Sequence, residues 1–181
     1  MDIFQIVQIS LIAIMVIAVI FGITVFFGAP YVPSLASELK KMFKKLYPLN
    51  SKDLLIDMGS GDGIVLKIAS EEFGAKALGI ELHPVLSFLS RIRLRKIRPL
   101  PKVVCQNYLN FVFPPETTVV YTFSDSRDIE KIYQKVQSEA TRLKKNLYFI
   151  SNGFELPGVK YEKQYSSFFL YQLKPGASKK S

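Results

Sequence analysis

The sequence predicts an α/β protein whose Rossmann-like, doubly wound and mostly parallel sheet is preceded by one N-terminal transmembrane helix. Three observations predict this architecture. Apolar runs alternate with helical patterns from residue 54 onward, a glycine-rich turn follows the first run, and residues 9–27 contain no charged side chain. We therefore expect an anchor and linker over 1–30, one domain over 31–173 and a flexible basic tail over 174–181.

The first segment is interpreted as an uncleaved, single-pass membrane anchor. The residues from Ile9 to Phe27 can cross a hydrocarbon core, with only Ser10 and Thr24 as polar exceptions. A signal peptide is the rival interpretation, but no lysine or arginine precedes the apolar run and no small-residue cleavage site stands out after it. All 24 lysines and arginines lie after residue 30, so the positive-inside rule predicts a cytoplasmic domain.

A short helix follows the proline-containing linker, with Ser34 as its expected N-cap. Over residues 35–46 the apolar and basic side chains separate onto opposite faces. The apolar face is expected to pack on the domain, and the lysines from Lys40 to Lys45 to attract anionic lipid head groups at about 1 kcal/mol each. The apolar face comprises Leu35, Leu39, Met42, Phe43 and Leu46.

Strands and helices are expected to alternate through the rest of the chain, which is typical of a parallel sheet with crossover helices. Predicted strands cover 54–57, 77–80, 103–106, 118–123, 147–151 and 168–173. Predicted helices cover 64–73, 84–96 and 128–144, the last with the clearest apolar stripe.

The glycine-rich turn is the feature that predicts a ligand. Residues 57–63 read Asp-Met-Gly-Ser-Gly-Asp-Gly, and three glycines at a spacing of two let the backbone approach a ligand closely. Glu81, at the end of the next strand, can accept both hydroxyl hydrogens of a ribose. A plain structural turn is the alternative interpretation.

The spacing also selects among nucleotides. A dinucleotide fingerprint would need a glycine where Ile64 stands, and no Gly-Lys-Ser/Thr phosphate loop is present. Asp57 and Asp62 would repel a pyrophosphate. A cofactor with a ribose and no phosphate fits best.

The turn resembles the motif of class I S-adenosylmethionine-dependent methyltransferases, with Asp57, Gly59, Gly61 and Gly63 followed by Glu81. The resemblance implies that S-adenosyl-L-methionine is the cofactor, with Asp57 near its methionine end. It also implies contacts from the rest of the loop, from Leu82 after the ribose-binding acid, from Asn107 near the adenine and from Tyr31 over the cofactor. The additional loop residues are Ser60 and Asp62.

The whole order of segments resembles the membrane-anchored protein lysine methyltransferases related to the mitochondrial ATP synthase c-subunit methyltransferase, and their bacterial relatives. The anchor, the Pro-Tyr-Val-Pro linker, the glycine loop, Gly-Ile-Glu-Leu-His-Pro and the later Ile-Ser-Asn-Gly-Phe-Glu-Leu-Pro-Gly carry this resemblance. It implies N-methylation of a lysine in a membrane or membrane-associated protein. Two other classes stay open: a methyltransferase acting on a membrane lipid, quinone or other small molecule, and a non-catalytic cofactor-binding scaffold.

Asp125 and Asp128 are the candidate catalytic residues, because a carboxylate after the fourth predicted strand could steer a lysine ammonium or accept its proton. Tyr121 or Phe123 could wall the aliphatic stem of that lysine. N-capping by Asp128 is the structural alternative.

The net charge of +9 allows a nucleic-acid surface around Arg91 to Arg98. Acidic residues nevertheless gather at the predicted strand ends, which favours a cationic substrate, so nucleic acid is not the expected partner. His83 has no second histidine to join it, so no metal site is expected. Cys105, in an apolar strand, is predicted to be buried.

Overall fold

The computed structural model describes residues 2–27, 36–124 and 127–176, with the side chains of residues 18 and 20–27 left out. The chain divides into two compact units, Met1–Val32 and Pro33–Ser181. In the first unit, the helix α1 runs over Ile3–Phe27. Among the described residues, no helix is found that is long and apolar enough to cross a membrane, so the predicted anchor stays a prediction.

The second unit is built on a mixed sheet of seven strands in the order β3-β2-β1-β4-β5-β7-β6. The first five of these strands are parallel and β7 is antiparallel to both of its neighbours. The strands are β1 (Leu54–Met58), β2 (Lys76–Glu81), β3 (Lys102–Cys105), β4 (Val119–Phe123), β5 (Leu147–Asn152), β6 (Lys163–Tyr165) and β7 (Phe168–Leu173). The predicted doubly wound, mostly parallel sheet is confirmed.

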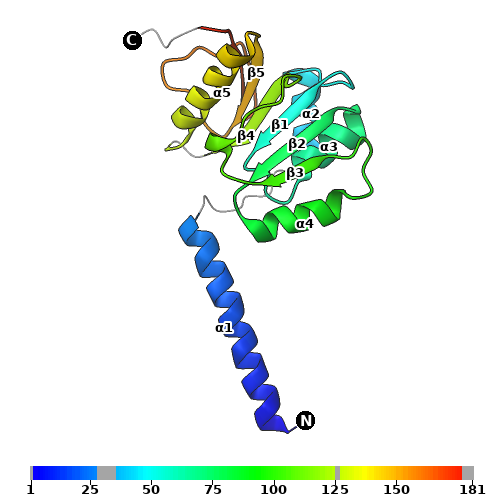
Figure 1. Ribbon diagram of the computed structural model, residues 1–181, viewed down its shortest axis with the longest axis vertical. Helices are drawn as coiled ribbons and strands as arrows, with labels where there is room; N and C mark the ends of the chain where they lie inside the picture. Colours follow the sequence, from blue (N-terminus) through cyan, green and yellow to red (C-terminus); the bar gives the residue numbers. More distant parts are fainter. Residues whose placement is uncertain (1, 28–35, 125–126, 177–181) are drawn as a thin grey trace. The chain divides into compact units, whose positions relative to one another are not determined.

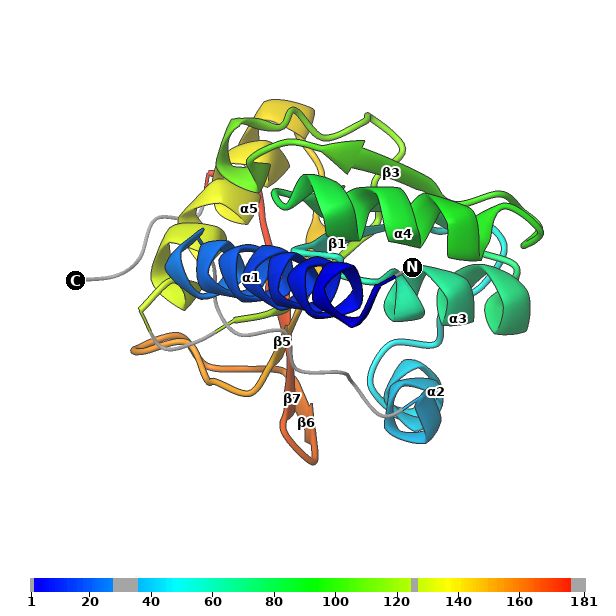
Figure 2. The same cartoon turned by 90° about the horizontal axis from the view of Figure 1, so that it is seen from below.

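Helices cover both faces of the sheet, as Figures 1 and 2 show. On one face lie α2 (Ala36–Lys45), α3 (Ile64–Phe73) and α4 (Pro84–Leu94), and on the other lies α5 (Ile129–Leu143). Each face has its own apolar core. The sheet is fully covered near β1 and β4, which are buried along most of their length.

The apolar face of α2 packs into the core as predicted, with Leu39, Met42 and Phe43 buried. Most of the α2 lysines contact side chains of the same unit. Lys40 pairs with Glu72 at 2.6 Å, Lys41 pairs with Glu38 at 3.0 Å, and Lys45 lies over the Tyr165 ring at 4.4 Å. Ser34 and Leu35 lie outside the described residues.

Two elements and one burial differ from the sequence predictions. The short strand β6 and a 3-10 turn, η1 (Tyr108–Asn110), were not predicted, because each is only three residues long and lacks a periodic pattern. Cys105 is exposed, so its predicted burial is wrong. The reason is that β3 is the edge strand of the sheet and ends at Cys105.

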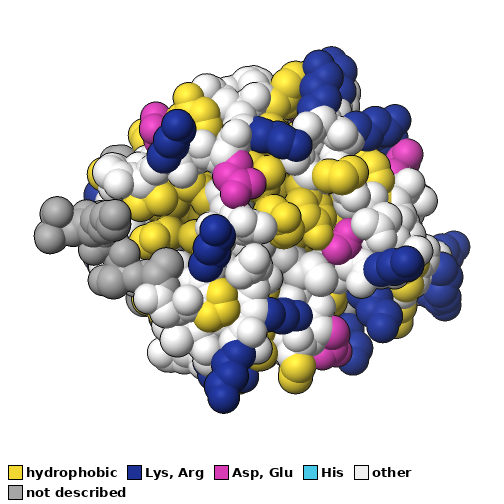
Figure 3. Space-filling model, turned by 90° about the horizontal axis from the view of Figure 1, so that it is seen from above, with side chains coloured by type: hydrophobic (Ala, Val, Ile, Leu, Met, Phe, Trp, Pro, Cys, Tyr) yellow, Lys and Arg dark blue, Asp and Glu magenta, His cyan; other side chains and the backbone are white. Residues whose placement is uncertain are grey.

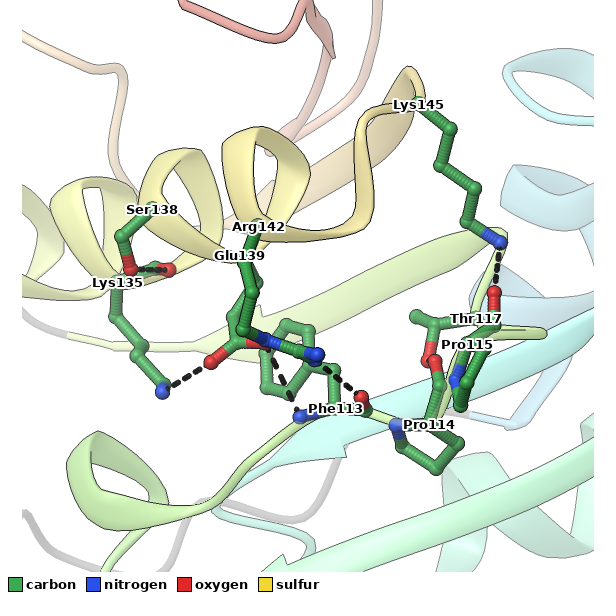
Figure 4. A network of polar contacts seen from close by, with 9 residues as sticks. All are labelled: Phe113, Pro114, Pro115, Thr117, Lys135, Ser138, Glu139, Arg142 and Lys145. Atoms are coloured by element: carbon green, nitrogen blue, oxygen red, sulfur yellow. Dashed lines mark hydrogen bonds and ion pairs between the residues drawn. The ribbon is translucent and has the colours of Figure 1, made fainter.

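A polar network ties α5 to the loop that leads into β4 (Figure 4). Glu139 is 4% exposed and accepts hydrogen bonds from Lys135 at 2.6 Å, from Arg142 at 2.6 Å and from the Phe113 N–H at 3.2 Å. Arg142 also donates to the Phe113 carbonyl. A buried carboxylate with this many donors is fully compensated, and its removal leaves buried donors unpaired.

Glu139→Gln should lower the free energy of unfolding by about 2 kcal/mol at pH 7, because it replaces charge-assisted hydrogen bonds with weaker ones. Burial by itself raises the pKa of Glu139, but the hydrogen bonds from Lys135 and Arg142 outweigh it and hold the pKa below its usual value. A depressed folded pKa contributes stability that is present above the unfolded pKa of about 4.3 and is lost as the pH falls through the folded pKa. The difference between wild type and variant should therefore shrink below about pH 4.

Urea unfolding at several pH values measures this difference. Glu71→Gln is the matched control, because Glu71 pairs with Lys67 at 3.7 Å and is 49% exposed. It should change stability by less than about 0.5 kcal/mol. If Glu139→Gln lowers the free energy of unfolding equally at pH 7 and pH 3, the stabilising role of the ionised Glu139 carboxylate is contradicted.

Candidate functional site

The candidate site lies where the strand order reverses, between β1 and β4. In open α/β sheets, ligands bind outside the carboxyl ends of the strands at such a point. The glycine-rich loop follows β1, the acid Glu81 ends β2, and residues 124–128 follow β4. The fold thus brings the glycine-rich loop, Glu81 and the described residues that follow β4 to the same edge of the sheet.

The loop after β1 has a backbone that glycine adopts readily. Gly59, Gly61 and Gly63 have φ values of 84°, 52° and 81°, in the left-handed region where other residues are strained. A side chain at Gly59 would meet no atom within 4 Å, so this glycine leaves open space next to the backbone. The loop is fixed beneath by hydrogen bonds from the Gly59 and Ser60 N–H groups to the Ile80 carbonyl at 2.8 and 3.2 Å.

Glu81 joins the loop to the end of β2. Its Oε2 accepts the Gly61 N–H at 2.8 Å and its Oε1 accepts the His83 N–H at 2.8 Å. The carboxylate is only 8% exposed. A carboxylate has about four lone-pair sites, so each oxygen keeps capacity for one further donor, which is what two ribose hydroxyls require.

Asp57 is the most buried acid of the site, at 2% exposed. In the sheet it is flanked by Gly79 of β2 and Tyr121 of β4. Burial raises the pKa of Asp57 well above its usual value, and the negative charges of Glu81 and Asp62 raise it further. A cationic ligand group beside these carboxylates would favour their ionised forms, so the electrostatics of the site suit a cation.

Two loop side chains, those of Asp62 and Ser60, lie against other parts of the protein. The Asp62 carboxylate pairs with Arg93 of α4 and accepts the Ile64 N–H at 3.2 Å. The Ser60 hydroxyl lies 2.5 Å from the place that a side chain on Gly79 would occupy, so Gly79 makes room for the loop. A cofactor contact by either side chain stays a prediction.

Gly63 lets the loop and α4 approach closely. A Cβ at this position would lie 2.3 Å from the Ser90 hydroxyl and 3.1 Å from a methyl group of Leu94. A side chain here would force the Ser90 hydroxyl to move and would crowd Leu94, in a left-handed backbone conformation that favours glycine. The third glycine therefore serves packing, independently of any ligand.

Two further predicted cofactor residues follow β2 and β3, and the one expected near the adenine is Asn107. Asn107 caps η1, its side-chain oxygen accepting the Leu109 N–H at 2.9 Å, which leaves its amide nitrogen available as a donor. Leu82 is 51% exposed directly after Glu81. Tyr31 lies outside the described residues.

Of the candidate catalytic residues, Asp125 lies outside the described residues and Asp128 is the N-cap residue of α5. The Asp128 carboxylate makes no side-chain cap hydrogen bond and lies 3.6 Å from the Lys131 ammonium. Phe123 is 37% exposed at the end of β4, whereas Tyr121 is 1% exposed and part of the core. Tyr121 is therefore excluded as a wall of an open substrate channel, and Phe123 stays a candidate.

A polar cluster at the ends of β4 and β5 was not expected from the sequence. Asn152 donates to the Tyr121 hydroxyl at 3.0 Å and accepts from the Ser167 hydroxyl at 2.8 Å. The Ser124 hydroxyl is buried, and within the described residues it has no hydrogen-bond partner. A buried, unpaired hydroxyl at the carboxyl end of the sheet is a candidate ligand contact. In the sequence, the polar run Ser-Asp-Ser after β4 was the feature that could have indicated this cluster.

No family model matches this chain. A 64-residue segment is 39% identical to the ATP synthase c-subunit lysine N-methyltransferase of Xenopus laevis, covering 35% of this chain and 27% of the frog protein. A protein-lysine N-methyltransferase of Saccharolobus islandicus (strain REY15A) is 27% identical over 132 residues, covering 71% of this chain and 79% of that protein. The match thus spans only about a quarter of the frog relative, and most of the archaeal one.

Among solved structures, an RNA methyltransferase from Salinibacter ruber in complex with S-adenosyl-L-homocysteine superposes with a TM-score of 0.73 at 19% sequence identity. The superposition covers 83% of this chain and 98% of that chain. The fold is therefore the Rossmann-like fold of methyltransferases. The resemblance to protein lysine methyltransferases, inferred from the order of segments along the chain, is confirmed by the two relatives.

Proposed function

We propose that this chain is an S-adenosylmethionine-dependent methyltransferase that N-methylates a lysine of a membrane or membrane-associated protein. One observation carries the cofactor assignment. In a methyltransferase fold, the Glu81 carboxylate accepts a hydrogen bond from the Gly61 N–H and still has acceptor capacity for a ribose. The two similar proteins that are named as lysine methyltransferases support the substrate class.

The residues present fit this cofactor. Gly59 leaves open space beside the loop, Glu81 would hold the ribose, and Asn107 can donate to the adenine side. Asp57 would face the positively charged methionine end, where a cation offsets its burial beside other acids. When bound, S-adenosylmethionine supplies a methyl group activated by its sulfonium.

The protein must position the substrate lysine against the methyl group and remove a proton from the lysine ammonium. A free lysine has a pKa of about 10.4, so its amine must be desolvated or deprotonated before it becomes a nucleophile. Asp125 and Asp128 follow β4 in the sequence, and either carboxylate could attract the ammonium. Phe123 offers an apolar surface for the stem of the lysine.

The experiment that tests this function adds the purified full chain and methyl-labelled cofactor to membranes. We expect label in a small set of membrane proteins, recovered as methyl-lysine after hydrolysis, and none with the Glu81→Ala variant. Asp125→Asn and Asp128→Asn should each reduce transfer more than they reduce cofactor binding. Label solely in lipid or RNA would overturn the substrate class, and cofactor binding without any transfer would indicate a non-catalytic scaffold.

One face of the domain lacks a continuous basic surface. On the face in Figure 3, Lys and Arg side chains are dispersed, with apolar and acidic side chains between them. A nucleic-acid surface is typically a continuous basic patch or stripe.

We also propose a single-pass membrane anchor with the domain on the cytoplasmic side. The uncharged sequence of residues 9–27 and the placement of all 24 lysines and arginines after residue 30 support it. The anchor would confine the site to the membrane surface and raise the effective concentration of membrane-bound substrates.

The anchor predicts that the protein resists extraction by carbonate, because the apolar segment would have to leave the bilayer. Added protease should leave the domain intact in sealed spheroplasts and digest it after lysis. A Val16→Arg/Val19→Arg variant is the control, since two charges near the bilayer centre should make the protein extractable. Digestion of the domain from outside would contradict the orientation.

A further inference from the structure

Helix α4 buries two serines and exposes four large apolar side chains. Ser87 and Ser90 are at most 1% exposed, and within the described residues neither hydroxyl has a hydrogen-bond partner. On the outer side, four large apolar side chains are between 45% and 60% exposed: Val85, Phe88, Leu89 and Ile92. Exposing four large apolar side chains to water is unfavourable, and adjacent exposed apolar residues are typical of an interaction surface.

The exposed apolar residues form one continuous stripe. At about 100° per residue, positions 85, 88, 89 and 92 fall within about 100° of the helix circumference. The buried positions 87, 90 and 94 lie on the opposite side. We call the four exposed residues the α4 stripe.

The surroundings of the α4 stripe are cationic. Residues 82–100 contain five arginines and lysines and no acidic residue. By the same helical spacing, Arg93 lies on one flank of the stripe and Arg91 on the other. Arg93 pairs with Asp62 and remains 46% exposed, and Arg91 donates to the Val103 carbonyl at 3.1 Å while remaining exposed.

We propose that the α4 stripe is a membrane-docking surface that inserts into the interfacial region of an anionic lipid bilayer. An apolar stripe flanked by arginines is the arrangement of helices that lie in the membrane interface. The apolar side chains would enter the acyl boundary while the arginines reach the phosphates. A second copy of the chain fits less well, because two stripes face to face would bring their like charges together.

Docking through the α4 stripe does not depend on the methyl-transfer chemistry. It also differs from lipid contact through the lysines of α2, because most of those lysines have partners within the unit. The α4 stripe consists of apolar side chains that nothing in the described part of the chain covers, and exposed arginines flank it.

The chain contains no tryptophan, so a single introduced tryptophan reports its own surroundings. Phe88→Trp places it in the α4 stripe. Gln134→Trp is the matched control, because Gln134 is exposed on α5, on the other side of the sheet. Each full-length variant is reconstituted into vesicles of phosphatidylglycerol and phosphatidylcholine with brominated acyl chains, and the fluorescence is measured.

We expect the Phe88→Trp emission to be blue-shifted and strongly quenched, and the Gln134→Trp emission to stay that of a tryptophan in water. Both variants carry α1, so tethering by α1 alone cannot produce this difference. Quenching of Phe88→Trp should weaken in vesicles of phosphatidylcholine alone, and in an added Arg91→Gln/Arg95→Gln background. Phe88→Asp should lower cross-linking of α4 to a photoactivatable lipid by about tenfold or more, with cofactor affinity unchanged as the control for folding.

Equal emission from the two tryptophans, or an unquenched Phe88→Trp, would overturn the proposal. A blue shift that arises without lipid and disappears on dilution would assign the α4 stripe to a second copy of the chain instead. A shift produced by added RNA and not by lipid would assign it to nucleic acid. Either result overturns the lipid assignment while leaving the methyltransferase proposal intact, because cofactor binding and transfer are measured separately.

Discussion

Replacing Glu81 by alanine should weaken the binding of S-adenosylmethionine by about 100-fold or more, because two hydrogen bonds to a charged acceptor are lost. The structure adds a second reason: the same carboxylate holds the Gly61 N–H at 2.8 Å and the His83 N–H at 2.8 Å. The variant therefore loses the ribose contact and loosens the loop that must approach the cofactor. Titration calorimetry measures the combined effect.

A double cycle separates the two contributions. A cofactor analogue without the ribose 2′-hydroxyl should bind wild type more weakly than the intact cofactor does, and Glu81→Ala should cost the analogue less affinity than it costs the intact cofactor. The loss that the analogue still shows measures the loosened loop and the contact with the 3′-hydroxyl. Glu71→Ala, on the exposed surface of α3, is the control and should leave both affinities unchanged. If Glu81→Ala binds the intact cofactor as tightly as wild type does, the site assignment is wrong.

Gly63→Ala should lower the free energy of unfolding by about 2–4 kcal/mol, because the new methyl group would overlap a packed helix and the backbone would be strained. The Cβ would lie 2.3 Å from the Ser90 hydroxyl, at a φ of 81°. Denaturant unfolding of the purified protein measures the loss.

Two partner variants divide this loss into its causes. Gly59→Ala has a similar φ of 84° and meets no atom within 4 Å, so it should show the backbone strain alone, at about 1 kcal/mol. Ser90→Ala removes a buried hydroxyl that lacks a described partner, and should be nearly neutral by itself. Combined with Gly63→Ala, it should recover most of the packing loss. No recovery in the double variant would refute the close contact.

The sequence predicted the regular elements closely, because each has a strong local pattern. The predicted helix 128–144 is α5, Ile129–Leu143, and the predicted strand 54–57 is β1, Leu54–Met58. The antiparallel direction of β7 was not predicted, since direction depends on pairing with β5 and leaves no mark in a single apolar run.

The candidate site was predicted by position but not by contact. The motif identified Glu81 and the glycines, yet the bond between Glu81 and Gly61 joins residues twenty positions apart, so only the fold reveals it. Likewise, the position of Asp62 in the glycine motif could not show that its carboxylate pairs with Arg93. The exposure of the α4 stripe was hidden for the same reason: its spacing is that of any amphipathic helix, and sequence alone does not say which side faces the sheet.

Two contacts join α4 to the glycine loop. The Asp62 carboxylate holds Arg93, and Gly63 lies directly against Ser90. If the α4 stripe rests on lipid, the height and tilt of the cofactor cradle above the bilayer are fixed by the same two contacts. The distance of a lysine from the membrane surface would then decide whether the enzyme can reach it.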